Sequence, residues 1–189
     1  AVITALQSSG LPACGGALPV AAEDTLQPSP EFPLGGGPTP RRIDVLVVYT
    51  PAVRTAVGGA AAARALAQNA VAWSNHAFGL SGALQRVSLA DAREIAYVEQ
   101  GVPAGTQLTW LRDNATVASW RNAVGADLVA MISNDGGGAC GIGYYMGNVG
   151  PGFAPHGYSM SARTCAVGNL SFPHELGHNM GAHHDPANA

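Results

Sequence analysis

A run of aliphatic and β-branched residues at positions 43–49, Ile-Asp-Val-Leu-Val-Val-Tyr, constrains the fold of this chain more than any other segment. Its nearly continuous apolar character indicates a strand buried on both faces, as in sheets that helices cover on either side. Thr50 and Pro51 follow directly, and they are typical of the cap and the first position of a helix. The sequence therefore predicts a strand–helix unit in a layered α/β fold.

The rest of the chain continues this alternation of strands and helices. Gly58 and Gly59 interrupt the first helix, and a longer helix is expected over about residues 60–78, where apolar residues recur on one face. Further expected elements are a strand within 84–98, helical segments at 108–112 and 117–124, a strand at 127–133, extended pieces at 141–145 and 157–162, and a last helix. This order predicts a mixed α/β (α+β) domain with an edge strand in its glycine-rich part.

Composition divides the chain into two parts. Residues 1–40 hold seven of the thirteen prolines and a Gly-Gly-Gly run, so we expect residues 1–41 to be a linker or the remnant of a pro-segment. The expected domain then comprises residues 42–189. No basic and hydrophobic leader precedes Ala1, so any signal peptide is expected to have been removed or left out.

Charge and hydropathy argue against two classes of partner. The net charge is −3 and all nine basic residues are scattered arginines, so the sequence has no basic stripe for a nucleic acid backbone. The longest apolar runs, at 45–49 and 128–132, are far shorter than the roughly 20 residues that span a bilayer. We therefore expect neither nucleic acid binding nor a membrane span.

The last helix carries histidines in a spacing that suits a metal ion. His174 and His178 lie four residues apart, so on a helix both imidazoles project from one face and reach the same ion. Glu175 then lies beside that ion rather than on it. A third ligand has to arrive from another direction, and Gly181 allows this because glycine adopts the positive φ that ends a helix. The chain can then turn back so that His184 becomes the third ligand.

Residues 174–184 match the metzincin signature His-Glu-x-x-His-x-x-Gly-x-x-His. Asp185 resembles the adamalysin or reprolysin branch and its bacterial secreted relatives of the peptidyl-Asp metallopeptidase type, and with Gly181 it is assigned to the structural turn. Residues 43–51 and 136–145 also resemble the first strand and the approach to the edge strand of that family. The resemblance implies a twisted five-stranded mixed sheet with two long helices, the second carrying the motif. It also implies an edge strand that binds an extended peptide or protein substrate in antiparallel direction.

The chemistry implied by this motif is hydrolysis of peptide bonds. The three neutral histidines, His174, His178 and His184, leave one position of Zn²⁺ open for water, whose pKa the ion lowers to about 7. Glu175 would take a proton as the water attacks and later deliver it to the leaving amine. We therefore predict a secreted zinc-dependent endopeptidase.

Three alternatives remain beside this interpretation. One is a catalytically weak or silent zinc-containing binding or adhesion module of the same fold, although such a scaffold does not require Glu175. Another is a thermolysin-like peptidase, whose third ligand is a glutamate on a later helix, and the turn at 181–184 argues against it. Within the motif, His183 competes with His184 as third ligand, but the spacing from Gly181 favours His184.

The chain departs from the family pattern at two places. The family's Met-turn lies beyond the third histidine, whereas this sequence ends at Ala189, so the C-terminal subdomain is expected to be absent from it. Met180 lies inside the motif and cannot replace that turn. Pro173 stands just before the motif, which a helix tolerates only near its start, so Ser171 or Asn169 is expected as N-cap. No pattern indicates an oligomeric state.

The three cysteines provide information on the cellular compartment in which the protein acts. Cys140 and Cys165 flank the expected edge-strand region, and a disulfide between them would imply a secreted, extracellular protein. Cys14 is left over. Its Pro-Ala-Cys-Gly context resembles the cysteine switch with which some metzincin pro-segments cap zinc, and an unpaired or otherwise paired cysteine is the alternative.

Overall fold

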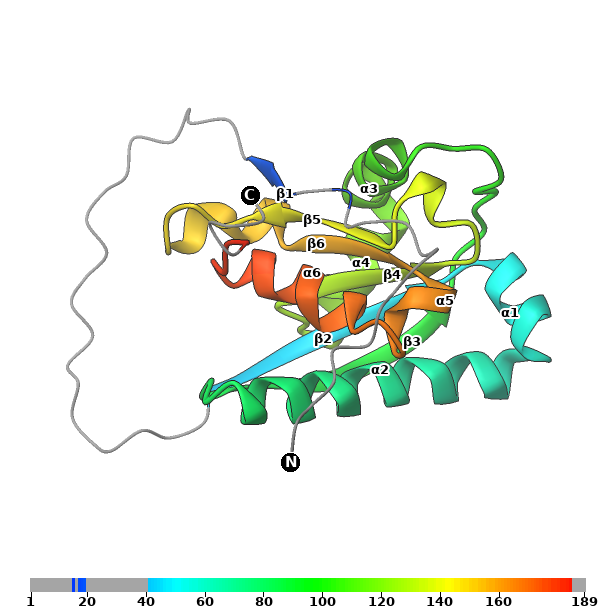
Figure 1. Ribbon diagram of the computed structural model, residues 1–189. Helices are drawn as coiled ribbons and strands as arrows, with labels where there is room; N and C mark the ends of the chain where they lie inside the picture. Colours follow the sequence, from blue (N-terminus) through cyan, green and yellow to red (C-terminus); the bar gives the residue numbers. More distant parts are fainter. Residues whose placement is uncertain (1–14, 16, 20–40, 185–189) are drawn as a thin grey trace.

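The computed structural model describes residues 15, 17–19 and 41–184, which form a sheet with helices on both faces (Figure 1). The strands are β1 (Ala17–Pro19), β2 (Arg41–Tyr49), β3 (Gln85–Glu94), β4 (Leu128–Ser133), β5 (Gly141–Tyr145) and β6 (Tyr158–Ala162). Their order across the sheet is β1-β5-β6-β4-β2-β3. Neighbouring strands are parallel except β5 and β6, which are antiparallel, so the predicted mixed sheet is confirmed.

Helices pack against both faces of this sheet (Figure 1). They are α1 (Pro51–Val57), α2 (Ala60–Leu80), α3 (Ala104–Asp113), α4 (Ala115–Val124), α5 (Arg163–Ala166) and α6 (Ser171–Asn179), with short 3₁₀ turns at Gly136–Gly138 and Pro151–His156. In the described part of the chain, no helix combines the length and apolar character needed to cross a membrane.

Strand β2 has apolar side chains packed on both faces, as its sequence predicts. Val45 and Val47 belong to the core that α2 and α6 cover. Leu46 and Val48 point the other way, into the core that α3 and α4 cover. All four side chains are fully buried, which is why this strand shows no alternation of apolar and polar residues.

Helix α1 begins where the sequence predicts. The Thr50 hydroxyl oxygen accepts a hydrogen bond from the Val53 amide at 3.2 Å, and Pro51 occupies the first turn. Gly58 ends the helix with a φ of 91°, a conformation that residues with a side chain rarely adopt. The chain can therefore enter α2 after only two glycines, so that α2 packs along the sheet beside β3.

Helix α6 has no side-chain cap, so the expectation of Ser171 or Asn169 as N-cap is wrong. Leu170 precedes the helix in the left-handed conformation, with a φ of 57°, and Ser171 is already the first helical residue. The His174 amide donates to the Leu170 carbonyl at 3.1 Å. Pro173 consequently lies in the first turn, where helical amides have no partner inside the helix and a missing N–H costs little.

A short strand lies in the segment for which the sequence predicts a linker. Residues 41–184 form five strands, the number that the resemblance implies, and β1 adds a sixth by pairing with β5. The pairing is parallel and places Ala17 opposite Gly143. No local pattern indicates this strand, because a three-residue strand depends on its partner rather than on its own sequence.

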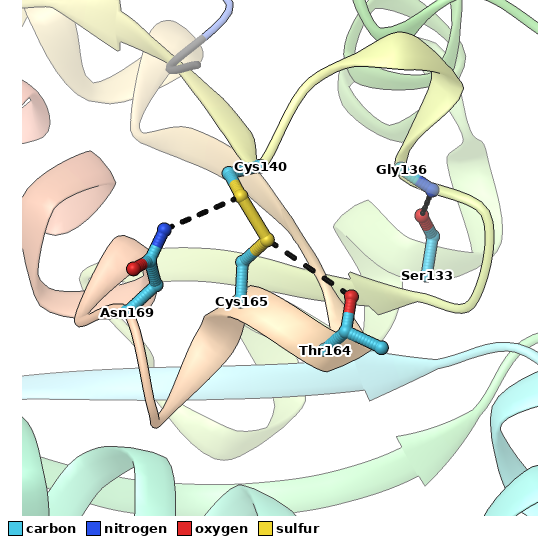
Figure 2. The surroundings of a disulfide bond; sticks show 6 residues. All are labelled: Ser133, Gly136, Cys140, Thr164, Cys165 and Asn169. Atoms are coloured by element: carbon cyan, nitrogen blue, oxygen red, sulfur yellow. Dashed lines mark hydrogen bonds between the residues drawn. A yellow bond between two sulfur atoms is a disulfide. The ribbon is translucent and has the colours of Figure 1, made fainter. Parts of the chain in front are cut away.

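The predicted disulfide between Cys140 and Cys165 is present and joins the residue before β5 to α5 (Figure 2). Both cysteines are buried. The side-chain amide of Asn169 donates to the Cys140 sulfur at 3.6 Å, and the Thr164 hydroxyl lies 4.0 Å from the Cys165 sulfur. The disulfide therefore fixes the beginning of β5 to the segment that leads into α6.

Replacing both Cys140 and Cys165 by alanine is expected to lower the free energy of unfolding by roughly 3 to 4 kcal/mol, because the disulfide closes a loop of 25 residues in the unfolded chain. Urea unfolding followed by circular dichroism would measure the difference. Chemical reduction of the unmodified protein should produce a similar loss. Recovery of both cysteines as free thiols from protein kept under oxidising conditions would contradict the pairing.

Candidate metal centre and active site

Helix α6 is anchored in the core and presents two histidines from it. Phe172 and Leu176 are buried among residues of β2, β4 and α2. His174 and His178 lie one turn apart, and their ring centroids are 4.7 Å from each other. Because the helix is held by its buried apolar residues, the two imidazoles have a fixed mutual position.

The turn after α6 depends on Gly181, whose φ is 90°. The Gly181 amide donates to the His178 carbonyl at 3.1 Å, and the Ala182 amide donates to the Gly177 carbonyl at 2.8 Å. These two bonds form a Schellman turn, which glycine favours because it needs a left-handed residue after the helix. The turn reverses the chain and brings His184 back to the helix.

Three histidine nitrogens converge at this turn. Nε2 of His184 lies 3.1 Å from Nε2 of His174 and 3.1 Å from Nε2 of His178. A tetrahedral zinc ion with Zn–N bonds of about 2.0–2.1 Å would hold its nitrogen ligands about 3.3 Å apart. The donor set therefore fits zinc. Among residues 15, 17–19 and 41–184, these three histidines are the one group of three or more potential metal ligands whose ligand atoms all lie within 4.8 Å of one another.

Hydrogen bonding and pKa both favour the neutral imidazoles that bind metals. His178 Nδ1 lies 2.9 Å from the Ala182 carbonyl oxygen, to which it donates in the tautomer that leaves the Nε2 lone pair for an ion. Desolvation, followed by the charges of the His178 and His184 rings, lowers the pKa of His174 to about 4. Desolvation is also the main reason that the pKa of His178 is lowered. At neutral pH these two ligands have no proton to lose before a metal binds.

Glu175 belongs to α6, and its side chain lies against β5. Its side chain is 1% exposed, and a Cβ at Gly141 would come 2.5 Å from its Oε1 atom. A Cβ at Gly143 would lie 3.0 Å from its main-chain oxygen. Two alternate glycines of β5 thus allow the strand to approach the helix and leave room for the carboxylate. The Gly-x-Gly spacing within a strand is the sequence signal that could have indicated this close approach.

Asn179 holds β5 and β6 at the end of their pairing, a role that no sequence pattern indicates. Its side chain is 2% exposed, and its Nδ2 donates to the carbonyl oxygens of Tyr144 at 2.8 Å and Tyr158 at 3.0 Å. The β5–β6 register ends just before these residues, at Gly143 and Ser159. The Asn179 side-chain amide therefore bonds to both strands where their own pairing ends, and it connects them to the helix that carries the histidines.

The structure brings His184, and not His183, to the other two histidines. The His183 ring packs instead on Tyr145, with the ring centroids 4.3 Å apart. Asp185 and Cys14 lie outside the described residues, so the predicted roles of Asp185 in the turn and of Cys14 as a zinc cap stay predictions.

Two curated relatives are similar to most of this chain. The peptidyl-Asp metalloendopeptidase of Pseudomonas aeruginosa is 29% identical over 156 residues, which are 77% of this chain and 26% of that protein. The peptidyl-Asp metalloendopeptidase of Stenotrophomonas maltophilia strain R551-3 is 33% identical over 154 residues, which are 79% of this chain and 35% of that protein. The chain thus spans between a quarter and about a third of the length of these relatives.

A solved structure described as that of a chaperone–substrate complex has a similar fold. Its TM-score is 0.62 at 23% sequence identity, over 77% of this chain and 24% of that chain. The family model described as metallo-peptidase family M12 matches residues 39–189, which include β2 and the three convergent histidines. The resemblance to metzincin-like metallopeptidases is confirmed at this level, and the chain belongs to metallo-peptidase family M12.

Proposed function

We propose that this protein is a zinc-dependent endopeptidase. The observation that carries the proposal is the convergence of three histidine nitrogens, from His174, His178 and His184, at spacings that suit a tetrahedral ion. Three imidazoles are typical of a catalytic zinc site, which keeps its fourth position for water or substrate. Membership of a metallo-peptidase family and the names of the two relatives support the assignment.

In this proposal Glu175 moves the protons. When bound, zinc supplies a Lewis acid that lowers the pKa of a water ligand to about 7 and polarises a carbonyl group. Glu175 accepts a proton from the attacking water and then delivers one to the leaving amine, so the peptide bond breaks without a covalent bond to the protein. Burial of the carboxylate against Gly141 supports this role, because a confined side chain keeps its orientation through both proton transfers.

The edge of β5 is the proposed binding site for an extended peptide or protein substrate, which would pair with this strand in antiparallel direction. Among the five strands of residues 41–184, β5 lies at one edge, and Gly141 brings it next to Glu175. A strand edge offers a row of backbone N–H and C=O groups that recognise extended peptides largely independently of their sequence. A substrate paired there would pass its backbone close to the proposed base.

We further propose that the protein acts outside the cell. The Cys140–Cys165 disulfide supports this, since disulfides persist in oxidising compartments and are rare in reducing ones.

The proposal is tested by metal analysis together with peptide cleavage. We expect zinc at one ion per three-histidine site, and cleavage that a chelator abolishes and added zinc restores. Because the relatives are named for peptidyl-Asp bonds, the peptide panel should contain matched pairs that differ only by Asp or Asn. Stoichiometric zinc without cleavage of any peptide would favour the binding or adhesion module, and absence of zinc binding would refute the metal site.

A further inference from the structure

The last part of β5 is held by α6, which runs alongside it (Figure 1). The pairing of β5 with β6 stops at Gly143. Beyond it, the Tyr144 carbonyl oxygen accepts a hydrogen bond from Nδ2 of Asn179 at 2.8 Å, and the Met146 amide donates to the His178 carbonyl oxygen at 3.0 Å. Two consecutive residues of the helix that carries the histidines therefore replace β6 as the partner of this strand end.

The orientation of the Asn179 side-chain amide follows from its partners. It contacts the carbonyl oxygens of Tyr144 and Tyr158, which can only accept hydrogen bonds, so its NH₂ group donates to both. The Oδ1 atom is buried and has no hydrogen-bond partner within the described part of the chain. Burying such an oxygen is unfavourable and offsets part of the stability that the two bonds contribute. Asn179 therefore serves the geometry of the two strands more than the stability of the fold.

A cavity of about 640 Å³ adjoins this end of β5. Met146, Asn179 and Met180 line it together with residues of the loop that follows β5, among them Gly150 and Phe153. Side chains beside a cavity lack contact atoms on one side, so dispersion forces restrain them less than in a filled core. The hydrogen bonds from α6 consequently determine where the strand end lies.

We propose that Asn179 is a positioning residue of the peptidase, which fixes the β5 edge in register with the metal ligands. The inference rests on the proposed function, because it concerns how a substrate is placed at that same site. Asn179 directly follows His178, so a single turn of α6 carries both a proposed metal ligand and the amide that holds the proposed substrate-binding edge. A peptide that pairs with β5 is thereby kept at a constant distance from Glu175. This constancy matters because a misplacement of about 1 Å can lower a reaction rate about 10²-fold.

Asn75 provides a matched control at the opposite edge of the sheet. It belongs to α2, and its side-chain amide donates to the Val87 carbonyl oxygen and accepts from the Val87 amide, both at 2.8 Å. Val87 lies in β3, the edge strand farthest from the histidines in the order of the sheet. Both asparagines thus connect an edge strand to a helix, but only Asn179 does so beside the proposed metal site. A merely structural role predicts similar consequences for the loss of either amide.

The experiment compares the zinc-loaded full chain with its Asn179→Leu, Asn179→Asp and Asn75→Leu variants. Leucine removes both donors at similar size, and aspartate places a carboxylate oxygen where the amide donates. Zinc content and hydrogen–deuterium exchange of residues 144–146 are measured on each protein. kcat and KM are measured on a long peptide and on a short blocked peptide that cannot extend along β5.

Both Asn179 variants are expected to keep their zinc, because the three histidines are unchanged. Exchange at residues 144–146 should become about tenfold faster, as the loss of strand-holding hydrogen bonds requires. On the long peptide kcat should fall about 10²-fold, while KM and the cleavage of the short peptide change little. Asn75→Leu should lower Tm and leave zinc content, the exchange of residues 144–146 and kcat unchanged.

Equal losses of kcat in Asn75→Leu and Asn179→Leu would show that general destabilisation is the cause and would overturn the inference. Unchanged exchange of residues 144–146, or loss of zinc from both Asn179 variants, would overturn it as well. If Asn179→Leu does not fold, Asn179→Asp decides on the same measurements. Absence of cleavage by the unmodified chain at full zinc occupancy would instead refute the proposed function, and the inference with it, whatever the exchange rates.

Discussion

Glu175→Gln is expected to keep its zinc and to lose about 10² to 10⁴ in kcat, the range typical of losing a general acid–base group. Glutamine has nearly the same size as glutamate, so it can fill the space beside Gly141 without disturbing β5. It has no carboxylate to accept a proton. Zinc should stay because the convergent ligand group consists of histidines alone. Metal analysis and steady-state peptide cleavage by the same preparations would measure the two effects.

Glu94→Gln is a suitable control for this substitution. Glu94 ends β3, at the sheet edge opposite β5, and its side chain forms an ion pair with Arg54 at 2.7 Å on the surface. The same chemical change there should leave both zinc content and kcat unchanged. A fully active Glu175→Gln enzyme would refute the proposed mechanism. A Glu175→Gln protein that lost its zinc would instead mean that the carboxylate supports the metal site structurally.

The elements that the sequence predicts correctly are those whose signals are local. Residues 43–49 are apolar at successive positions because both faces of β2 are buried, and this pattern needs no knowledge of the partners. Thr50 caps α1 through a hydrogen bond to a residue only three positions later. The same holds for the convergence of His174, His178 and His184, since four-residue spacing on a helix and one glycine turn bring the three rings together.

The features that the sequence does not predict depend on contacts between distant segments. β1 exists through pairing with β5, more than 120 residues later in the chain. Asn179 is a short polar residue in the motif, and its importance follows only from the carbonyl groups of Tyr144 and Tyr158. Leu170 adopts a left-handed conformation that its side chain disfavours, so no capping rule would select it. In each case the deciding interaction is tertiary, and local propensity is too weak to reveal it.

His178→Ala is expected to lose the metal, because two histidines bind zinc much more weakly than three. The loss of affinity should exceed the roughly 10- to 100-fold that is typical when an outer partner of a ligand is removed. The side chain does more than ligate, since its Nδ1 also bonds to the Ala182 carbonyl in the turn that positions His184. Competition with a chromophoric chelator would measure the affinity, and the zinc-dependent rise in Tm should disappear with it.

Two further variants distinguish ligand loss from damage to the fold. His184→Ala removes a ligand from the turn rather than from the buried part of the helix, so it should lose zinc while circular dichroism and urea unfolding of the metal-free chain change little. His183→Ala removes the adjacent histidine, whose ring packs on Tyr145 and takes no part in the cluster, and zinc affinity should stay the same. Retention of zinc by both His178→Ala and His184→Ala, or its loss in His183→Ala alone, would show that the ligand set has been assigned wrongly.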